Sequence, residues 1–306
     1  LVAAFNHQHI FLDPEPDAAR GFRERERLFN LPRSSWTDYD AQLISRGGGV
    51  FPRNAKEIAL SPQARSLLGI DAPKSTPAEI IRAILKLPVD LHWNGGIGTY
   101  VKASWEANSA VGDRTNDSVR VDGRDLRCKV VGEGGNLGCS QLGRIEYALH
   151  GGRLNTDFVD NSGGVDCSDH EVNIKIQLKT VQERTRMTTA ERNRLLESMT
   201  EDVGQLVLRD NYLQSQAISL LQAAAPERLG EHAHFIRSLD LDGVLDRALE
   251  YLPSAEEIED RRRAGLGLVR PELAMLLSYA KIALSAQLIQ SDVPEDPYLS
   301  QELDRY

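Results

Sequence analysis

The sequence is poor in cysteine and in residues set in recognisable catalytic motifs. Its three cysteines, Cys128, Cys139 and Cys167, form no CxxC pair. This usage favours a reducing compartment and offers neither a disulfide framework nor a zinc site. The sequence also contains no GxGxxG after a predicted strand, no P-loop, no GxSxG and no HExxH. We therefore predict no catalytic residue and no metal ligand from motifs alone.

Long apolar runs and surplus positive charge are also lacking. Residues 273–289 form the most apolar stretch, but Ser278, Lys281, Ser285 and Gln287 interrupt it. It falls short of the roughly 20 apolar residues that a membrane span needs. The net charge of −9 argues against general nucleic-acid binding, and the basic runs at 23–27 and 261–263 sit among carboxylates, as solvated helix faces do. The chain begins without a signal-peptide pattern. We predict a cytoplasmic protein with neither membrane nor nucleic acid as a partner.

The first half of the chain alternates strand-like and helix-like segments. Apolar runs occur at 1–5 and 10–13, strands are predicted at 89–93, 129–132 and near 157–160, and helices at 76–86 and 141–150. This alternation is typical of a parallel α/β sheet. After about residue 175 the pattern becomes helical, with helices predicted over 189–221, 232–239, 241–252 and 255–264 and another from Arg270. The sequence therefore predicts an α/β domain over residues 1–178 and an all-helical region over 179–306.

Each predicted strand of this domain ends in a cluster rich in glycine and asparagine. The clusters are Asn94-Gly95-Gly96, Glu133-Gly134-Gly135-Asn136 and Asn161-Ser162-Gly163-Gly164. Glycines let the backbone approach a ligand closely, and amides hydrogen-bond without imposing charge. One such cluster is more often a plain turn. Three of them at successive strand ends indicate a shared ligand crevice, because those ends converge.

Two further polar segments leave alternatives open. Asn6 follows the first apolar run, where a dinucleotide fold normally carries an acid for the ribose hydroxyls, but a turn between two strands explains it equally well. The polar run 164–171 suggests a metal or acid–base site. Its carboxylates could instead cap and charge the first turn of the next helix. Cys167, in the same run, is expected to be buried filler.

The sequences of these segments resemble motifs of the glutamate dehydrogenases. KVVGEGGNL at 129–137 resembles the family's EGAN strand and turn, and NSGGV at 161–165, followed by Ser168, resembles its NAGGV loop. FNHQHIFLDP from Phe5, GGGVF from Gly47 and WNGGIGTYVK from Trp93 are typical of the large bacterial NAD-dependent branch. RDNY from Arg209 and RPELA from Arg270 extend the match through the helical tail, so the resemblance spans nearly the whole chain.

The resemblance implies an incomplete Rossmann-like domain that binds NAD and serves the oxidation of L-glutamate to 2-oxoglutarate and ammonia. Asn161 would lie near the nicotinamide, Ser168 would contact the substrate, and Asn6 would face the adenosine ribose, where the family often has Asp. The implied cofactor-binding residues are Asn6, Asn94, Gly95, Gly96, Glu133, Gly134, Asn136 and Asn161.

The resemblance also places the family's glycine-rich phosphate loop and its catalytic Lys and Asp before the segment that opens this chain. The chain, which starts without methionine, is therefore expected to be an excised piece that is inactive alone. A homo-oligomer is also expected. The alternative is a non-catalytic dinucleotide-sensing or interaction module of the same ancestry, which the coding sequence upstream of Leu1 would distinguish.

Overall fold

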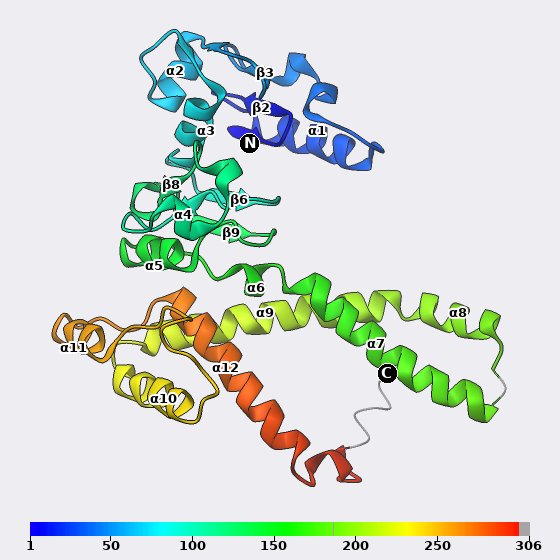
Figure 1. The fold of residues 1–306 in the computed structure, drawn as a ribbon. Helices are drawn as coiled ribbons and strands as arrows, with labels where there is room; N and C mark the ends of the chain where they lie inside the picture. The colour runs from blue at the N-terminus through cyan, green and yellow to red at the C-terminus, as the bar shows by residue number, and fades with distance from the viewer. Residues whose placement is uncertain (186, 300–306) are drawn as a thin grey trace. The chain divides into compact units, whose positions relative to one another are not determined.

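The computed structural model describes residues 1–185 and 187–299. Within them the chain forms two compact units, each described by itself (Figure 1). Unit 1 comprises Leu1–His92, Gly96–Val131 and Leu137–Tyr147. Unit 2 comprises Trp93–Gly95, Gly132–Asn136 and the described residues from Ala148 onward. The mixed α/β class with a helical C-terminal region is confirmed.

Unit 1 opens with an antiparallel sheet of three strands in the order β1-β2-β3. The strands are β1 (Ala3–Phe5), β2 (His9–Leu12) and β3 (Gly49–Pro52). In its register Ile10 pairs with Phe5 on one side and with Phe51 on the other. This pairing differs from the parallel arrangement expected for the first half. Only three residues join β1 to β2, and a parallel pair needs a crossover of a dozen or more.

The rest of unit 1 is built from short strands and helices around the buried side chains of β2 and α3. Its helices are α1 (Ala18–Asn30), α2 (Pro62–Leu68), α3 (Pro77–Leu85), α4 (Asn108–Val111) and most of α5 (Gln141–Leu149). Its further strand pairs are β4 (Ile58–Ala59) with β5 (Lys74–Ser75), antiparallel, and β7 (Val101–Lys102) with β8 (Val121–Asp122), parallel. The helices predicted at 76–86 and 141–150 are confirmed. Helix α3 begins as expected, with Thr76 as cap and Pro77 in its first turn.

Strands β6 (Leu91–Asn94) and β9 (Val130–Glu133) pair with each other, and the division between the units passes through both. The Val130 N–H donates to Asp90 O at 3.0 Å, and beyond the strand ends the Gly135 N–H donates to Asn94 O at 3.0 Å. These strands confirm the predictions at 89–93 and 129–132. Their adjacent ends bring the first two glycine-rich clusters together.

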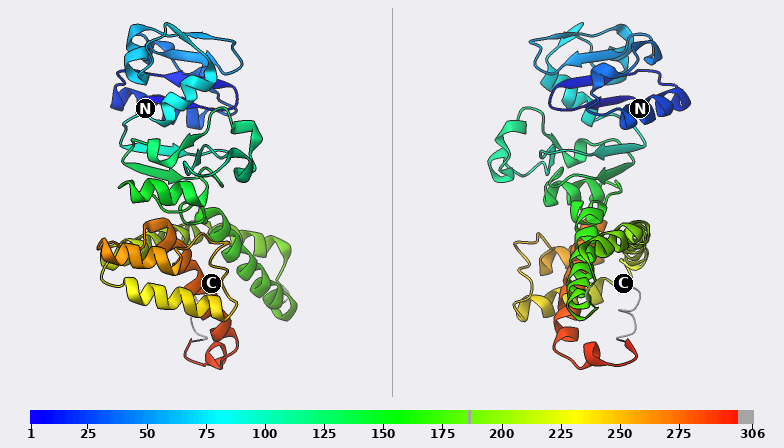
Figure 2. Two further views of the ribbon diagram at one scale, coloured as in Figure 1. Left: turned by 60° about the vertical axis from the view of Figure 1, so that its left-hand side comes forward. Right: turned by 90° about the vertical axis from the view of Figure 1, so that its right-hand side faces the viewer.

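Unit 2 is helical. Its helices are α6 (Asp157–Asp160), α7 (Ser162–Thr185), α8 (Thr189–Ser198), α9 (Thr200–Ala224), α10 (Leu229–Leu241), α11 (Ala255–Arg263) and α12 (Arg270–Ile289). Helices α7 and α12 both pack on α9, as the views in Figures 1 and 2 show. The core includes Ile218 of α9, Ile236 of α10 and Leu273 of α12, all fully buried. This core holds together helices that are far apart in sequence.

Two predicted elements are wrong. The segment near 157–160 is the helical turn α6 and not a strand, since the Asp160 N–H donates to Thr156 O at 3.1 Å and two aspartates in four residues disfavour a strand. The predicted helix over 241–252 is a series of turns. Gly243 has φ +68°, a left-handed conformation that ends helices. Leu245 and Leu252 mimic helical spacing because both are buried in the core.

Helix α12 is long and apolar enough to cross a membrane by length and composition, contrary to the expectation from its interruptions. One such helix is weak support for a span, since a core helix of a soluble protein passes the same test. The first half of α12 behaves as a core helix, with Leu273, Ala274 and Leu276 buried. In its second half, Ile282, Leu284 and other apolar side chains are exposed.

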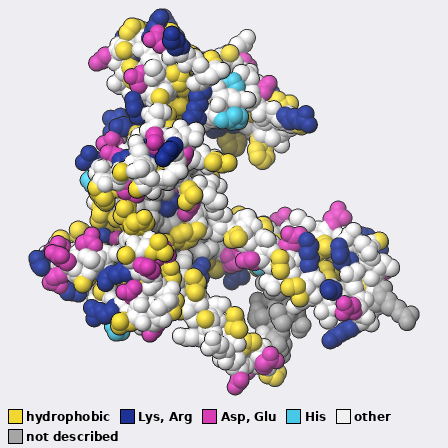
Figure 3. Space-filling view, viewed as in Figure 1, with side chains coloured by type: hydrophobic (Ala, Val, Ile, Leu, Met, Phe, Trp, Pro, Cys, Tyr) yellow, Lys and Arg dark blue, Asp and Glu magenta, His cyan; other side chains and the backbone are white. Residues whose placement is uncertain are grey.

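The basic run 261–263 divides between surface and interior. Arg262 and Arg263 are exposed and pair with Glu259 of the same helix, as a solvated face should. Figure 3 shows acidic and basic side chains interspersed over α11. Arg261 differs, because it turns inward and forms an ion pair with the buried carboxylate of Glu272 on α12 at 2.6 Å. The expectation is confirmed for two arginines and wrong for the third.

Candidate functional site

The ends of β6 and β9 form two turns in contact. Asn94 closes β6 and is buried, and its carbonyl accepts the hydrogen bond from Gly135. A Cβ at Gly134 would lie 2.3 Å from Cζ2 of Trp93, so any other residue there would force the ring to move. The Trp93 side chain is nevertheless 60% exposed. The two turns therefore present a flat aromatic surface next to polar backbone, in part because Gly134 has no side chain that would displace the ring.

The side chains of Asn136 and Asn161 meet beside these turns. Nδ2 of Asn161 donates a hydrogen bond to Oδ1 of Asn136. Within residues 1–185 and 187–299, the amide nitrogen of Asn136 and the amide oxygen of Asn161 make no other hydrogen bond, which leaves one donor and one acceptor for a ligand. Leu137, the next residue after Asn136, has φ +59°, an uncommon conformation for a residue other than glycine. Such strained backbone often occurs at binding sites.

A chain of hydrogen bonds supports this cluster from behind. The Glu133 N–H donates to Oδ2 of Asp160 at 3.0 Å, and Nδ2 of Asn155 donates to Oδ1 of Asp160 at 2.7 Å. Oδ1 of Asn155 in turn accepts from Nη2 of Arg270 at 2.7 Å, and Nη1 of Arg270 donates to Ser219 of α9 at 3.0 Å. Burial lowers the pKa of Arg270, and the nearby Asp160 opposes that shift. The helical region thus fixes the end of β9 through Asp160.

Asn161 is not at a strand end, as the sequence suggested. It closes α6 and directly precedes α7, so Gly163 and Gly164 form the first turn of a helix. Asn211 of α9 holds this helix start: its Nδ2 donates to Val159 O at 3.0 Å and to Oγ of Ser162 at 3.1 Å. The RDNY segment therefore positions α7, a role that the sequence alone did not indicate.

The polar run 164–171 lies inside α7. Because the helix begins at Ser162 and has no acid in its first turn, the interpretation of Asp166 and Asp169 as capping residues is wrong. Cys167 is exposed, which corrects the expectation of buried filler. Ser168 is also exposed, on the second turn of the helix, and its expected contact with substrate stays a prediction.

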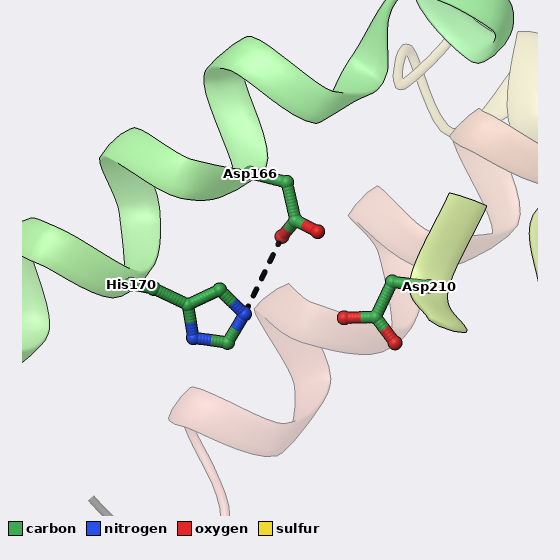
Figure 4. Close-up of side chains that lie close together, drawn as sticks. All are labelled: Asp166, His170 and Asp210. Carbon is green, nitrogen blue, oxygen red and sulfur yellow. Dashed lines mark ion pairs between the residues drawn. The ribbon is translucent and has the colours of Figure 1, made fainter. Parts of the chain in front are cut away.

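The structure adds a third side chain, Asp210, to two residues of the polar run 164–171, for which the sequence suggested a metal or acid–base site. Asp166 and His170 of α7 face Asp210 of α9, and one ligand atom from each lies within 4.8 Å of the other two (Figure 4). Oδ1 of Asp166 is 3.8 Å from Nε2 of His170. Burial raises the pKa of Asp166, and the charge of Asp210 adds to the effect. Because Asp210 comes from a separate helix, no spacing in the sequence signals that it joins Asp166 and His170.

Asn6 belongs to unit 1. Its Oδ1 accepts hydrogen bonds from the backbone N–H groups of Gln8 at 2.8 Å and His9 at 2.7 Å, so it closes the turn between β1 and β2. The turn interpretation is thus confirmed, and the ribose contact stays a prediction. Gly96 also lies in unit 1, and a Cβ there would meet nothing within 4 Å.

Two family models match the sequence. The model described as "Bacterial NAD-glutamate dehydrogenase, catalytic domain" matches residues 1–221, and the model "Glutamate dehydrogenase, C-terminal" matches residues 265–306. Together they cover both the site and most of the helical tail. The resemblance expected from the strand-end motifs is confirmed.

Curated relatives agree with these matches. The protein named NAD-specific glutamate dehydrogenase of Pseudomonas aeruginosa is 60% identical over 304 residues, which are 99% of this chain. Those of Halomonas elongata and Mycobacterium tuberculosis are 54% and 51% identical, and both matches cover 100% of the chain. The chain spans 19% of the length of each of these relatives. Because the family model matches residues 1–221 and these relatives are 51–60% identical, the chain belongs to the bacterial NAD-glutamate dehydrogenase catalytic-domain family.

Proposed function

We propose that the chain forms the cofactor-binding side of an NAD-dependent glutamate dehydrogenase. The complete protein would convert L-glutamate, NAD and water to 2-oxoglutarate, ammonia and NADH. The observation that carries the proposal is the carboxamide pair Asn136–Asn161 beside the end of β9, fixed by Asp160. The family match and the names of the relatives support it. Because the chain covers a fifth of their length, the activity is proposed for the complete protein.

The carboxamide pair fits a nicotinamide amide group. That group carries one acceptor and one donor function, which complement the amide nitrogen of Asn136 and the amide oxygen of Asn161. Bound NAD supplies the hydride acceptor of the reaction. Asn94, Gly95 and Gly96 would line the same crevice with backbone groups.

The turn Glu133–Gly134 and the exposed ring of Trp93 would form the wall of this crevice. Gly134 has no side chain, and this lets the ring lie directly on the turn. An exposed aromatic face packs well against a planar ring of a ligand. Glu133 is fully buried, and its backbone N–H is held by Asp160. Its part is to fix the backbone of the turn.

Ser168 would contact the substrate. It follows Asn161 along α7 by about 10 Å at 1.5 Å per residue, a spacing that accommodates glutamate beyond the nicotinamide. Gly163 and Gly164 leave the first turn of α7 without side chains, and the positive end of the helix dipole favours a substrate carboxylate there. The catalytic Lys and Asp are proposed to come from sequence outside this chain. Alone, the chain is expected to lack turnover, since hydride transfer needs both reactants held in place and a tuned acid–base pair.

The remaining features are proposed on the same basis. Residues 1–178 would act as the Rossmann-like NAD-binding domain and residues 179–306 as the helical domain, with α7 running through the boundary between them. Asn6 would face the adenosine ribose. The exposed apolar side chains in the second half of α12 support contacts with further protein, as in a homo-oligomer. The proposed location is the cytoplasm, in amino acid catabolism.

Steady-state kinetics of the complete protein test the proposal. Asn161→Ala removes a nicotinamide contact and the bond to Asn136, so KM for NAD should rise about 2- to 13-fold per hydrogen bond lost, at 0.5–1.5 kcal/mol each. Asn193→Ala, an exposed asparagine on α8, is the matched control and should leave KM unchanged. An Asn161→Ala enzyme with unchanged KM and kcat would remove the support for the site. Equal turnover with NADP would contradict the cofactor assignment.

A further inference from the structure

We propose that Asp166, His170 and Asp210 form a binding site for a divalent transition-metal ion between α7 and α9. The three side chains offer two carboxylate oxygens and one imidazole nitrogen from two packed helices (Figure 4). This donor set suits Zn²⁺ or Mn²⁺, because imidazole and carboxylate both bind these ions well. The site is separate from the proposed NAD and glutamate contacts.

The geometry is close to that of a coordination sphere. Asp166 and His170 are four residues apart on α7, so they project from one face of the helix, toward α9. Their nearest ligand atoms are 3.8 Å apart, and all three ligand atoms lie within 4.8 Å of one another. An ion with ligand bonds of about 2.0–2.2 Å separates ligand atoms by roughly 3–4 Å. A movement of about 1 Å through side-chain torsions is enough to close the site.

The charges around the cluster favour a cation. Asp166 and Asp210 are half-buried and mutually repulsive, and both burial and this repulsion raise the pKa of Asp166. Asp169 adds to the negative potential, whereas His170 and Lys281 of α12 oppose it. The Lys281 ammonium, which donates to Gln214 at 2.8 Å, supplies a single positive charge near two carboxylates. A bound divalent ion would compensate the remaining negative charge. It would also be coordinated by the imidazole of His170, whose side chain is only 10% exposed.

The two helices are held in place without a metal. Asn211, the neighbour of Asp210, donates hydrogen bonds to Val159 O and Ser162 Oγ at the start of α7. The site is therefore largely preorganised, and loss of one ligand should not separate α7 from α9. Ser168 lies two residues beyond Asp166, about 200° around the helix, so the ion would lie behind the face that carries it. Its role would be to hold α7 rigidly behind the substrate-facing residue.

A metal titration of the complete protein tests the site. The protein is stripped with a chelator and titrated with Zn²⁺ or Mn²⁺ by calorimetry, and bound metal is counted by atomic emission after gel filtration. Wild type should bind about one ion per chain more than Asp210→Asn, with an affinity at that site at least about 10-fold higher, since even loss of an outer-shell partner costs that much. Glu183→Gln, an exposed acid nearer the C-terminal end of α7, is the matched control and should bind like wild type.

Hydrogen exchange gives a second readout. Zn²⁺ should slow the exchange of α7 and α9 in wild type and in Glu183→Gln, and should leave it unchanged in Asp210→Asn. Equal metal content, affinity and exchange in wild type and Asp210→Asn would overturn the proposal and leave a metal-free Asp–His–Asp cluster. If Asp210→Asn does not fold, His170→Gln provides the same comparison and the same two outcomes.

Discussion

The buried ion pair between Arg261 and Glu272 should dominate the local stability of the C-terminal helices. Nη1 and Nη2 of Arg261 donate to the two oxygens of Glu272 at 2.6 and 2.7 Å. The Glu272 side chain is 1% exposed and that of Arg261 12%. Glu272 also accepts the Val269 N–H at 2.8 Å, so its carboxylate caps α12 as well. Burial alone would lower the pKa of Arg261, yet contact with Glu272 raises it.

Glu272→Gln keeps the shape of the side chain and removes its charge, which leaves the Arg261 guanidinium buried without a counter-charge. Breaking one partner of a buried pair costs about 3–5 kcal/mol, which corresponds to roughly 140- to 4,000-fold faster exchange of amides that exchange through local opening. Native-state hydrogen exchange of α11 and α12 in the complete protein measures this directly. The control is Glu259→Gln, whose pair with Arg262 lies at the surface with Glu259 44% exposed. It should cost at most about 1 kcal/mol, or about fivefold.

Two outcomes separate the explanations. If Glu272→Gln accelerates exchange no more than Glu259→Gln, then the inward-facing ion pair contributes no more than a surface pair and the reasoning is refuted. The double variant Arg261→Met/Glu272→Gln removes both charges and keeps a side-chain oxygen that can accept the Val269 N–H. It should recover most of the lost protection, because the cost comes from the uncompensated charge and not from loss of the pair itself.

Two further predictions concern a turn and a helix cap. Gly134→Ala places a Cβ 2.3 Å from the Trp93 ring, so the ring must move. The KM for NAD should rise about tenfold, and the tryptophan fluorescence should change. The control is Gly230→Ala in α10, where a Cβ meets nothing within 4 Å, and it should change neither quantity. The carboxylate of Glu79 accepts the Thr76 N–H at 2.9 Å, and this bond, first among several, lowers the pKa of Glu79 from 4.5 to about 2. Its capping contribution is therefore complete above pH 4.5 and is lost as pH falls toward 2. Hydrogen exchange of α3 should show a difference between wild type and Glu79→Gln that is constant from pH 7 to 5 and shrinks below about 4.5; a constant difference at every pH would contradict this assignment.

The elements that the sequence predicted correctly are those with local causes. Helix α3 carries its own start signals, with Thr76, Pro77 and Glu79 forming the cap, and an apolar stripe on one face. Strand β6 lies in the segment 89–93, where apolar and polar residues alternate, and β9 begins with two valines; both are followed by glycine and asparagine. Where tertiary contacts determine the conformation of a segment, the local sequence pattern does not predict it. Leu245 and Leu252 are spaced like residues on one face of a helix, but they lie in a series of turns and are buried in the core.

The candidate site was predicted in part because all three glycine-rich clusters were expected at strand ends, and the structure does not support this for the third cluster. Asn161 was expected at the end of a strand, and it follows the short helix α6 instead. It still meets Asn136, because Asp160 ties α6 to the end of β9 and Asn211 ties α7 to α9. These ties join residues that are distant in sequence, so composition and periodicity contain no trace of them. The same holds for the approach of Asp210 to Asp166 and His170.

The bond between Arg270 and Asn155 has a consequence for how relatives of this protein can be recombined. The catalytic-domain model ends at residue 221 and the C-terminal model starts at 265, so the two regions look like exchangeable modules. Arg270 belongs to the second and Asn155 to the first, yet Nε and Nη2 of Arg270 both donate to the same oxygen of Asn155. A chimera that joins these regions from two relatives would have to inherit both side chains together. Without either of them, Asp160 would lose its support, and the end of β9 would be disturbed by a change made in the tail.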